Sequence, residues 1–417
     1  MTSNKTNKNN LSKNWEKKCL DNLFSFHGGL GISREQLGNK GIPYLHYGDM
    51  HKGTFSSVSY DDYTALPKYD IKINGNEDFL MKDGDVIFLD ASEDLTGTSR
   101  CVVIDNPDNK PFIAGLHTFI ARPLDNSLCK WYKKYFTQTQ DVQKQFERLS
   151  VGFKVYGVNR NSIKNIVVSF PSDIKEQQKI AKILAKWDEA IELQERLIEK
   201  LEIQKKGLMK KLLMPKKDWK KTNSTKIRLI DLCSAKPLYG LNEAATDDIT
   251  LPRYLRITDI NDNGNYVYQG AHVYCEDDVY ILKRNDIVFA RTGASVGKSY
   301  LYNEADGELA FAGFLIKFSI DPKKADSRFI SYCCNSKEYW KWVEINCARS
   351  GQPGINAEEY SSLNLPYFNF AQEEQKKIAN ILNKLDIETH LHFQKLELFK
   401  KQRKALMQLL LTGTVRV

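Results

Sequence analysis

The chain contains two copies of one long helical segment, and this duplication restricts the possible fold more than any other feature. The segment from Glu176 to Leu213 aligns without a gap with the segment from Glu374 to Leu411, at an offset of 198 residues. Of these 38 aligned positions, 17 are identical, which is more than a shared helical composition produces. A repeat of this length indicates that the chain is a tandem duplication of one structural unit.

Four shorter motifs precede the helix in both halves and in the same order. The pairs are 44–50 with 254–260, 82–88 with 283–289, 114–115 with 312–313, and 157–159 with 354–356. Between Gly, Asn and Asp turns lie short runs with β-type composition, at 86–89, 101–104, 287–289 and 315–318. Helical stretches are predicted at 128–146 and 327–345. Each half therefore consists of a variable, mixed α+β domain followed by a long helix.

Apolar residues recur at alternating spacings of four and three along both helices, which is the pattern of a coiled-coil seam. The apolar seam residues are Ile180, Leu184, Trp187, Ile191, Ile198 and Leu201 in the first helix, and Ile378, Leu382, Leu385, Leu396 and Phe399 in the second. A helix of this length, about 60 Å, is longer than one β-rich domain covers. We therefore predict that the helices pair as an antiparallel coiled coil with a pseudo-two-fold axis. The alternative is that each helix packs only on its own domain.

These features predict five segments. They are a mobile tail at 1–14, a variable domain at 15–171, a central long helix at 172–214, a linker with a second variable domain at 215–365, and a C-terminal long helix at 366–417. The predicted fold class is α+β, with two similar mixed α/β domains separated by the two long helices.

The loop Arg291–Ser299, with the sequence Arg-Thr-Gly-Ala-Ser-Val-Gly-Lys-Ser, raises the alternative of a nucleotide-binding site. A P-loop has four residues between its first glycine and Gly-Lys-Ser, but only three separate Gly293 from Gly297. The segment 300–303 has the composition of a strand rather than of a helix. The first half has a glycine at the corresponding place but Thr98 instead of Lys298. We interpret the loop as a turn between two strands, and a P-loop-like NTPase stays the alternative.

Composition and motifs favour a binding protein over an enzyme. The formal net charge is +9, which is compatible with a nucleic-acid partner. The sequence has no complete Walker A motif, no H-E-x-x-H motif and no methyl-transfer motif, and its seven histidines lack ligand spacing. No run of 18 apolar residues is present, so we predict no membrane span. The eight cysteines lack metal-ligand spacing and indicate reduced thiols in the cytoplasm. We therefore predict no catalytic residues, no metal and no bound cofactor.

Basic, aromatic and hydroxyl residues in the loops of both variable domains are candidates for contacting DNA. Arginine and lysine supply affinity for phosphates, and arginine on a guanine edge supplies specificity. The candidates are His46, Tyr47, Lys52, Thr98, Ser99 and Arg100 in the first domain, and Arg253, Arg256, Arg291, Thr292, Ser295 and Lys298 in the second. An ordinary solvated surface is the alternative for each residue alone, but the grouping at matching places in two copies favours contact.

The helix motifs resemble those of a known family. Glu-Gln-x-x-Ile-Ala-x-Ile-Leu opens each helix, and Leu406-Met-Gln-Leu-Leu-Leu-Thr-Gly413 ends the second. Together with the alternation of variable domain and long helix, these motifs resemble the DNA-specificity subunit of type I restriction–modification systems. The stretches 26–33 and 46–49 support the resemblance, which spans nearly the whole chain.

This resemblance implies that the two variable domains are target-recognition domains, each of which reads half of a split, asymmetric sequence in double-stranded DNA. It also implies that the paired helices dock two methyltransferase subunits and, in complexes that cut DNA, two restriction/translocase subunits. S-adenosylmethionine and ATP are then expected on the partner subunits only, and the protein is expected in a prokaryotic cytoplasm. A coiled-coil scaffold whose β-rich domains bind protein instead of DNA is the competing hypothesis.

Overall fold

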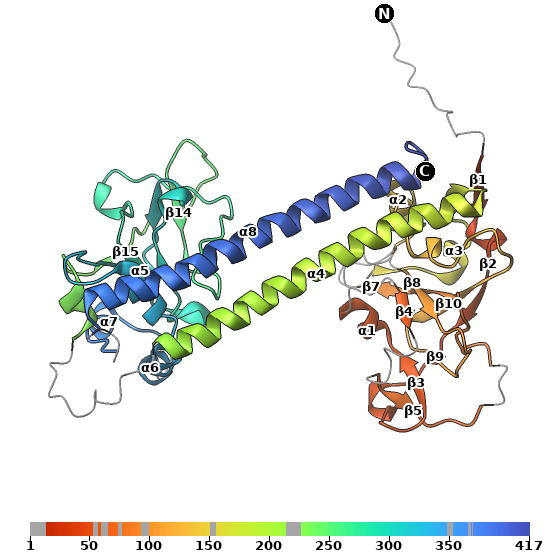
Figure 1. Ribbon diagram of the computed structural model, residues 1–417, viewed down its shortest axis with the longest axis horizontal. Coiled ribbons are helices and arrows are strands. Elements are labelled where there is room, and N and C mark those ends of the chain that lie inside the picture. The colour runs from red at the N-terminus through yellow and green to blue at the C-terminus, as the bar shows by residue number, and fades with distance from the viewer. Residues whose placement is uncertain are drawn as a thin grey trace, which may run out of the picture. The chain divides into compact units, whose positions relative to one another are not determined.

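The computed structural model describes residues 14–52, 57–59, 66–73, 77–92, 99, 101–150, 156–213, 227–347, 353–365, 368 and 370–417, with backbone alone at 51, 52, 57, 58, 91 and 92. The chain divides into two compact units. The first unit contains residues 1–194 and 395–417, and the second contains residues 195–394. Each unit therefore holds one variable domain and one segment of each long helix (Figure 1).

The variable domain of the first unit is built around a five-stranded sheet with the order β2-β10-β6-β8-β4. A three-stranded sheet, β5-β3-β9, and the pairs β1-β12 and β7-β11 complete it. Its strands are β1 (Trp15–Cys19), β2 (Phe24–Gly28), β3 (Ile42–Leu45), β4 (Ser57–Ser59), β5 (Lys68–Tyr69), β6 (Val86–Leu89), β7 (Ala91–Ser92), β8 (Cys101–Asp105), β9 (Ile113–Ala114), β10 (Thr118–Pro123), β11 (Tyr156–Gly157) and β12 (Val167–Pro171). Its short helices are α1 (Tyr47–Lys52), α2 (Gln140–Leu149) and α3 (Arg160–Ile163), with a 3-10 turn, η5, at Tyr132–Lys134.

The variable domain of the second unit repeats this plan with a four-stranded sheet of order β13-β18-β15-β16 and a parallel pair, β14-β17. Its strands are β13 (Leu238–Tyr239), β14 (Arg253–Leu255), β15 (Asp286–Ala290), β16 (Ser299–Leu301), β17 (Leu309–Phe311) and β18 (Leu315–Ser319). Its helices are α5 (Ser327–Cys333), α6 (Lys337–Cys347) and α7 (Ala357–Ser361), with a 3-10 turn, η10, at Gly293–Ser295. All four predicted β runs are strands, at β6, β8, β15 and β18. The helical stretch predicted at 128–146 is broken before α2, where Thr139 caps the helix by accepting a hydrogen bond from the Val142 amide.

Successive residues of the central strands pack into two different cores, because side chains alternate between the faces of a sheet. In the first unit, Val86 and Phe88 contact the core that includes α2, α4 and α8, whereas Ile87 and Leu89 contact the core beneath β3 and β9. In the second unit, Phe289 contacts the core that includes α5, α6 and α8, whereas Val288 contacts the core beneath β14 and β17. Both faces of each sheet are therefore buried, and one face of each is covered by the long helices.

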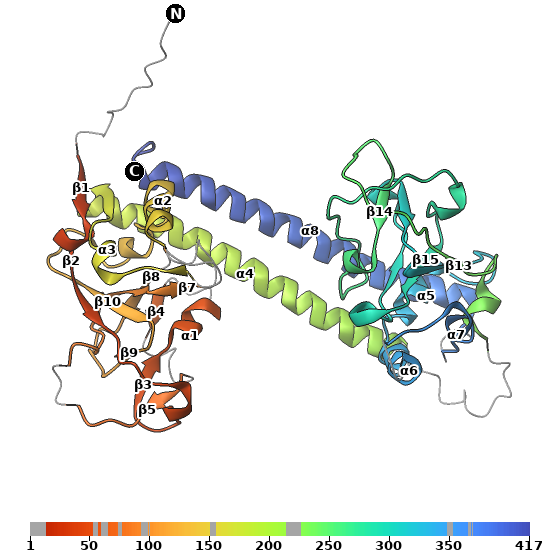
Figure 2. The same ribbon diagram turned by 180° about the vertical axis from the view of Figure 1, so that it is seen from behind.

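The two long helices are α4 (Ile174–Leu212) and α8 (Gln372–Leu411). Within each unit their segments run side by side in opposite directions (Figure 2). In the first unit, Ile180 and Leu184 share a core with Met407 and Leu410 of α8. All the apolar seam residues named above are buried or half-buried. The predicted fold class is confirmed: the helices pair with one another as well as packing on the domains. None of the helices in the described ranges is long and apolar enough to cross a membrane.

A charged cluster joins α4, α8 and the variable domain in the first unit. The Asp188 carboxylate accepts hydrogen bonds from Arg403 Nε, at 2.7 Å, and from the Tyr135 hydroxyl, at 2.7 Å. Trp187 packs edge-to-face on Phe399, with ring centroids 5.7 Å apart. Burial, followed by the charge of Asp188, raises the pKa of Tyr135, so its hydroxyl stays a hydrogen-bond donor.

The second unit has the same cluster at the corresponding positions of the repeat. Asp386 accepts a hydrogen bond from the Tyr332 hydroxyl, at 2.6 Å, and forms an ion pair with Lys205 Nζ, at 2.5 Å. Each long helix therefore supplies the aspartate of one cluster and the cation of the other. Because the aspartate precedes the cation in both helices, only an antiparallel arrangement satisfies both clusters.

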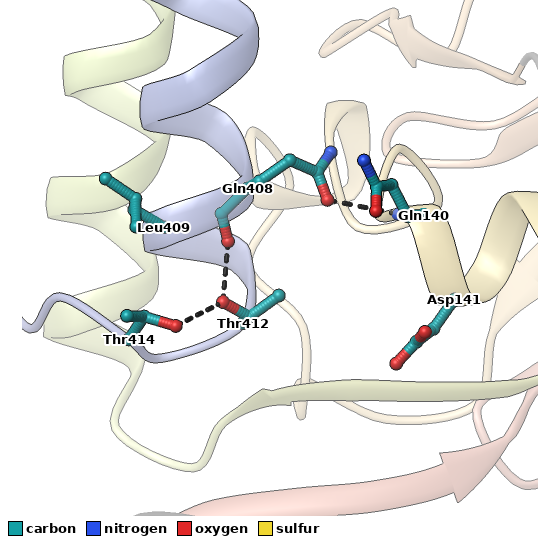
Figure 3. A pocket seen from close by; sticks show the side chains of 6 residues that line it. All are labelled: Gln140, Asp141, Gln408, Leu409, Thr412 and Thr414. Carbon is teal, nitrogen blue, oxygen red and sulfur yellow. Dashed lines mark hydrogen bonds between the residues drawn. The ribbon is translucent and has the colours of Figure 1, made fainter.

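The C-terminal end of α8 is fixed to the first variable domain. The Gln140 amide at the start of α2 donates a hydrogen bond to Gln408 Oε1, at 3.1 Å, and Thr412 Oγ1 donates to the Gln408 carbonyl (Figure 3). Beyond the helix, Arg416 forms a bidentate ion pair with Glu176 near the start of α4. Polar contacts therefore join the end of α8 and the residues beyond it to α2 and to the start of α4.

Candidate nucleic-acid interface

One pattern of backbone hydrogen bonds occurs at the end of the central strand in both units. In the first unit, the Asp90 amide donates to the His117 carbonyl, at 3.2 Å, and the Asp90 carbonyl accepts from the Val158 amide, at 2.8 Å. In the second unit, Arg291 makes the corresponding bonds to Phe314, at 3.0 Å, and Ile355, at 2.9 Å. The repeated motifs at 157–159 and 354–356 therefore hold equivalent loops in place.

The side chains on this shared frame differ. We name the residues Asp90, His117, His46 and Tyr47 the first corner. His117 Nδ1 lies 2.9 Å from Asp90 Oδ1, and both side chains are about half exposed, at 44% and 43%. The Tyr47 ring stacks at an angle on His46 and meets His117 edge-on, with centroids 4.4 and 5.2 Å apart. The first corner thus presents an aromatic surface with a carboxylate at its edge.

His46 is the buried member of the first corner. It is only 8% exposed, and its Nδ1 accepts a hydrogen bond from the Gly48 amide, at 3.1 Å. Burial lowers the pKa of His46, and the nearby Arg34 adds to this effect. Arg34 itself pairs with Asp49, at 3.0 Å, and Asp49 accepts from the His46 amide. The neutral imidazole is therefore part of the structure that carries Tyr47, which places His46 beneath the predicted contact surface.

The second corner consists of Arg291, Tyr239 and Phe314. The Arg291 guanidinium carbon lies 4.8 Å from the centre of the Tyr239 ring. The Tyr239 hydroxyl accepts a hydrogen bond from the Ala357 amide, at 3.0 Å, which fixes the ring behind the arginine. Phe314 is 60% exposed. The second corner thus presents a cation on the ring of Tyr239, with an exposed phenylalanine at the residue whose carbonyl accepts from the Arg291 amide.

The other predicted cations of the second unit have protein partners. Arg256 forms a bidentate ion pair with Asp259, whose side chain is 1% exposed, and hydrogen bonding by Asp259 raises the pKa of Arg256. Arg253 donates to the Asp306 carbonyl, at 2.7 Å, and packs on a tyrosine ring. Lys298 pairs with Asp262, at 2.8 Å, and a hydrogen bond from Lys298 lowers the pKa of that carboxyl. In the described part of the chain, no carboxylate pairs with Arg291.

The loop at 291–299 is a turn between β15 and β16, which are antiparallel neighbours. Its amides are used inside the protein: Gly293 donates to Pro353, Gly297 to Ala290, and Lys298 to Ser295. These amides cannot also surround a phosphate, and a strand follows where a P-loop requires a helix. Gly297 has φ +88, and a side chain there would clash with α6. The structure thus supports the turn and argues against the nucleotide site. Thr292 and Ser295 lie half-buried in this turn, beside Arg291.

Several predicted contact residues of the first unit cannot be placed in the same way. Thr98, Arg100 and the Lys52 side chain lie outside the described residues, and Ser99 is 7% exposed. Sequence reasoning missed Asp90, His117, Tyr239 and Phe314. The repeated Ala-Gly pairs at 114–115 and 312–313 were the available signal, because His117 and Phe314 lie two residues and one residue after them. Among the described residues, no group of three or more His, Cys, Asp or Glu side chains could hold a metal ion.

Comparison with known proteins assigns the two halves to one family. Residues 12–203 and 221–400 each match the family described as "Type I restriction modification DNA specificity domain". The two matches cover most of the chain, one in each half. The chain belongs to this type I restriction–modification DNA specificity family. The resemblance inferred from the helix motifs is confirmed, and so is the tandem repeat.

Relatives of the whole chain carry the same description. The type I restriction enzyme MjaVIII specificity subunit of Methanocaldococcus jannaschii is 24% identical over 400 residues, which cover 90% of this chain and 86% of the relative. The putative type I restriction enzyme MjaX specificity subunit of the same organism is 24% identical over 432 residues, which cover 99% and 96%. Specificity subunits are non-catalytic, so the family agrees with the predicted non-enzymatic role.

Two solved structures share the fold of the specificity family. The S subunit of the type I restriction–modification system from M. genitalium superposes with a TM-score of 0.57 at 16% identity, over 97% of both chains. A chain from a structure that addresses complex assembly and conformational transition of the type I system gives a TM-score of 0.58 at 12% identity, over 98% of this chain and 100% of that one. At these identities the likeness supports the fold alone.

Proposed function

We propose that this specificity subunit reads a split, asymmetric sequence in double-stranded DNA, one half with each variable domain. Residues 15–171 serve as one target-recognition domain, and residues 215–365 serve as the other. The observation that carries the proposal is the pair of corners: equivalent backbone frames display different side chains at the surface. A shared frame with different contact groups is what two domains need in order to read two different half-sites.

The candidate contact residues fall into two groups, according to whether their side chains are already bonded within the protein. Arg291, which pairs with no carboxylate in the described part of the chain, is the proposed base reader among them. Arg253, Arg256 and Lys298 are engaged by protein acceptors, so we assign them to shaping the domain and to contacts with phosphates through their remaining donors. Base edges are read by groups whose donors or acceptors are still available.

The outer faces of the long helices are the proposed docking surface for two methyltransferase subunits. The seam residues are used inside the chain, so they support the helix pair rather than meet the partner. Several other apolar side chains on the helices are exposed, and such residues mark protein interfaces when they cluster. They are Leu193, Leu197, Ile203, Ile381, Ile387, Leu391, Phe393, Leu398 and Leu409. Ile387 and Leu391, four residues apart, lie on one face of α8.

The chemistry of the complex belongs to the partners in this proposal. S-adenosylmethionine would bind the methyltransferase subunits, which methylate adenine, and ATP would bind restriction/translocase subunits in complexes that contain them. The specificity subunit supplies the DNA sequence selectivity and the platform on which the partners assemble.

The proposal is tested by exchanging one domain in the complete methyltransferase complex. Residues 215–365 are replaced by the equivalent domain of another specificity subunit, and adenine methylation is mapped across a genome that lacks other adenine methylation. We expect one half of the methylated sequence to change and the other half to stay. A methylated sequence unchanged in both halves would contradict the proposal. Docking is measured on the same complex: L391D should reduce co-purification of the methyltransferase, whereas I345D, at an exposed apolar position in α6, should not.

A further inference from the structure

We propose that the equivalent positions 90 and 291 are the base-reading positions of the two domains, and that they read base edges of opposite hydrogen-bonding character. Arg291 reads a guanine in the half-site of the second unit. Asp90 reads an exocyclic amino group, on cytosine or adenine, in the half-site of the first unit. This inference rests on the proposed function and extends it to the chemistry of the target.

Arg291 is the predicted cation of the second unit that keeps its donors available. Arg256 spends two donors on the buried Asp259, and Arg253 and Lys298 donate to backbone carbonyls or to a carboxylate. The Arg291 guanidinium carbon lies 4.8 Å from the centre of the Tyr239 ring, and no hydrogen bond within the described residues uses the side-chain N–H groups of Arg291. A cation–π contact of this kind does not consume N–H donors, so they stay available to a ligand. Those groups form the fork that matches the O6 and N7 acceptors of guanine.

The support around Arg291 makes this geometry reproducible. Its backbone is held on both sides, by Phe314 and by Ile355, and its ring support is held by the Ala357 amide. A side chain whose backbone and stacking partner are fixed loses less conformational entropy on binding. Phe314, whose carbonyl accepts from the Arg291 amide, adds an exposed apolar side chain to the second corner, suited to a thymine methyl group or to the face of a base.

Asp90 occupies the same place in the first unit but has the opposite hydrogen-bonding capacity. One carboxylate oxygen meets His117 Nδ1, and the carboxylate remains 43% exposed. An ionised carboxylate only accepts hydrogen bonds, so it pairs with a base that offers a donor in the major groove. Those donors are the amino groups of cytosine N4 and adenine N6. A guanine edge opposite Asp90 would place two acceptors against a negative charge.

The test uses the complete methyltransferase complex and begins with the wild-type chain. The half-site of the second unit is the half that changes on exchange of residues 215–365. It should contain an invariant guanine, and replacing that guanine by 7-deazaguanine, which lacks the N7 acceptor, should weaken binding about tenfold. In the half-site of the first unit, replacing one invariant cytosine or adenine by an analogue without its exocyclic amino group (2-pyrimidinone or purine) should weaken binding about tenfold, and a half-site in which no such replacement weakens binding would overturn the reading by Asp90. Apart from the domain exchange that assigns the two half-sites, this arm uses the wild-type chain.

The second arm changes the reading residue. R291Q should shift the preference at that one position from guanine toward adenine, because glutamine matches adenine N6 and N7, and should leave the other half unchanged. R284Q removes an exposed arginine from a different turn of the same domain and should keep the original sequence. A two-part sequence without an invariant guanine in the second half, or one that R291Q leaves unchanged, would overturn this inference but keep the proposed function. The absence of any two-part sequence would overturn both.

Discussion

The corners of the two units have the same backbone hydrogen bonds, yet one carries a carboxylate with a histidine and the other an arginine with two aromatic rings. The structures that support the corners are alike. In both units the two faces of the central sheet pack into two different cores, and a tyrosine–aspartate–cation cluster joins each domain to the helix pair. This contrast shows that the duplication preserved the supporting structure and changed the groups on display.

A second difference lies just below the corners. The loop carboxylates Asp49 and Asp259 have equivalent places, and each accepts a hydrogen bond from the backbone amide three residues before it. In the first unit the paired cation comes from Arg34, whereas in the second it is Arg256, at the position equivalent to His46. The same structural requirement is therefore met by different residues, which explains why matching positions in the two copies need not share a role.

The largest effect is expected from truncating the buried seam. It tests whether the helix pair contributes equally to the stability of both units. L184A and L382A each remove a fully buried seam side chain at matching positions of the repeat. Each should lower the free energy of unfolding of its own unit by about 2–5 kcal/mol, the usual cost of such a truncation in a core. Chemical denaturation measures the loss. L193A, at a position 58% exposed, is the control and should change stability by less than about 0.5 kcal/mol. A large loss in one unit alone would break the comparison.

An intermediate effect is expected from removing the cations that hold the two loop carboxylates. R256A leaves the buried Asp259 without its ion pair and should destabilise the second unit by about 1–3 kcal/mol. R34A removes a partner that is 54% exposed, from a carboxylate that is 20% exposed, and should cost less than about 1 kcal/mol. Thermal unfolding of both variants measures the two losses of stability. Equal losses would show that the two loops depend on their cations to the same degree.

The smallest expected effect is a pH dependence of stability. It distinguishes His46 from Arg256, the residue at the equivalent position of the second unit. The pKa of His46 is lowered in the folded chain, so the unfolded chain binds the proton more readily near pH 6. The stability contributed by His46 is therefore complete above its unfolded pKa and decreases as the pH falls through that pKa toward the lower folded value. H46N keeps an acceptor for the Gly48 amide but does not titrate. Between pH 7.5 and 5.5, the wild-type first unit should lose more stability than the H46N variant, and identical losses would contradict this assignment.

Features that depend on local periodicity could be predicted from the sequence. The four-three spacing along α4 and α8 identified the residues that become buried, because each turn of a helix returns side chains to the same face. The strands β6 and β15 could be found because continuous apolar runs between turns indicate buried strands. The family resemblance followed from the helix motifs, which are the best preserved part of the repeat.

The partners that complete each corner could not be predicted, because they depend on contacts between distant segments. Asp90 meets His117 only when the end of β6 and the start of β10 come together, and Tyr239 reaches Arg291 through the pairing of the two-residue strand β13 with β18. Charge alone suggested Arg256 as a DNA contact, although its spacing of three from Asp259 was visible. That pair is a local capping arrangement, so the sequence held a signal for the ion pair.

The two aspartate–cation clusters link the lengths of the long helices to each other. In α4, Asp188 precedes Lys205 by the same 17 positions that separate Asp386 from Arg403 in α8. An insertion or deletion between these positions in one helix, without an equal change in the other, would leave one aspartate without its cation. Viable changes in this stretch should therefore come in matched pairs, one in each repeat, and unmatched ones should be found only together with replacement of a cluster residue.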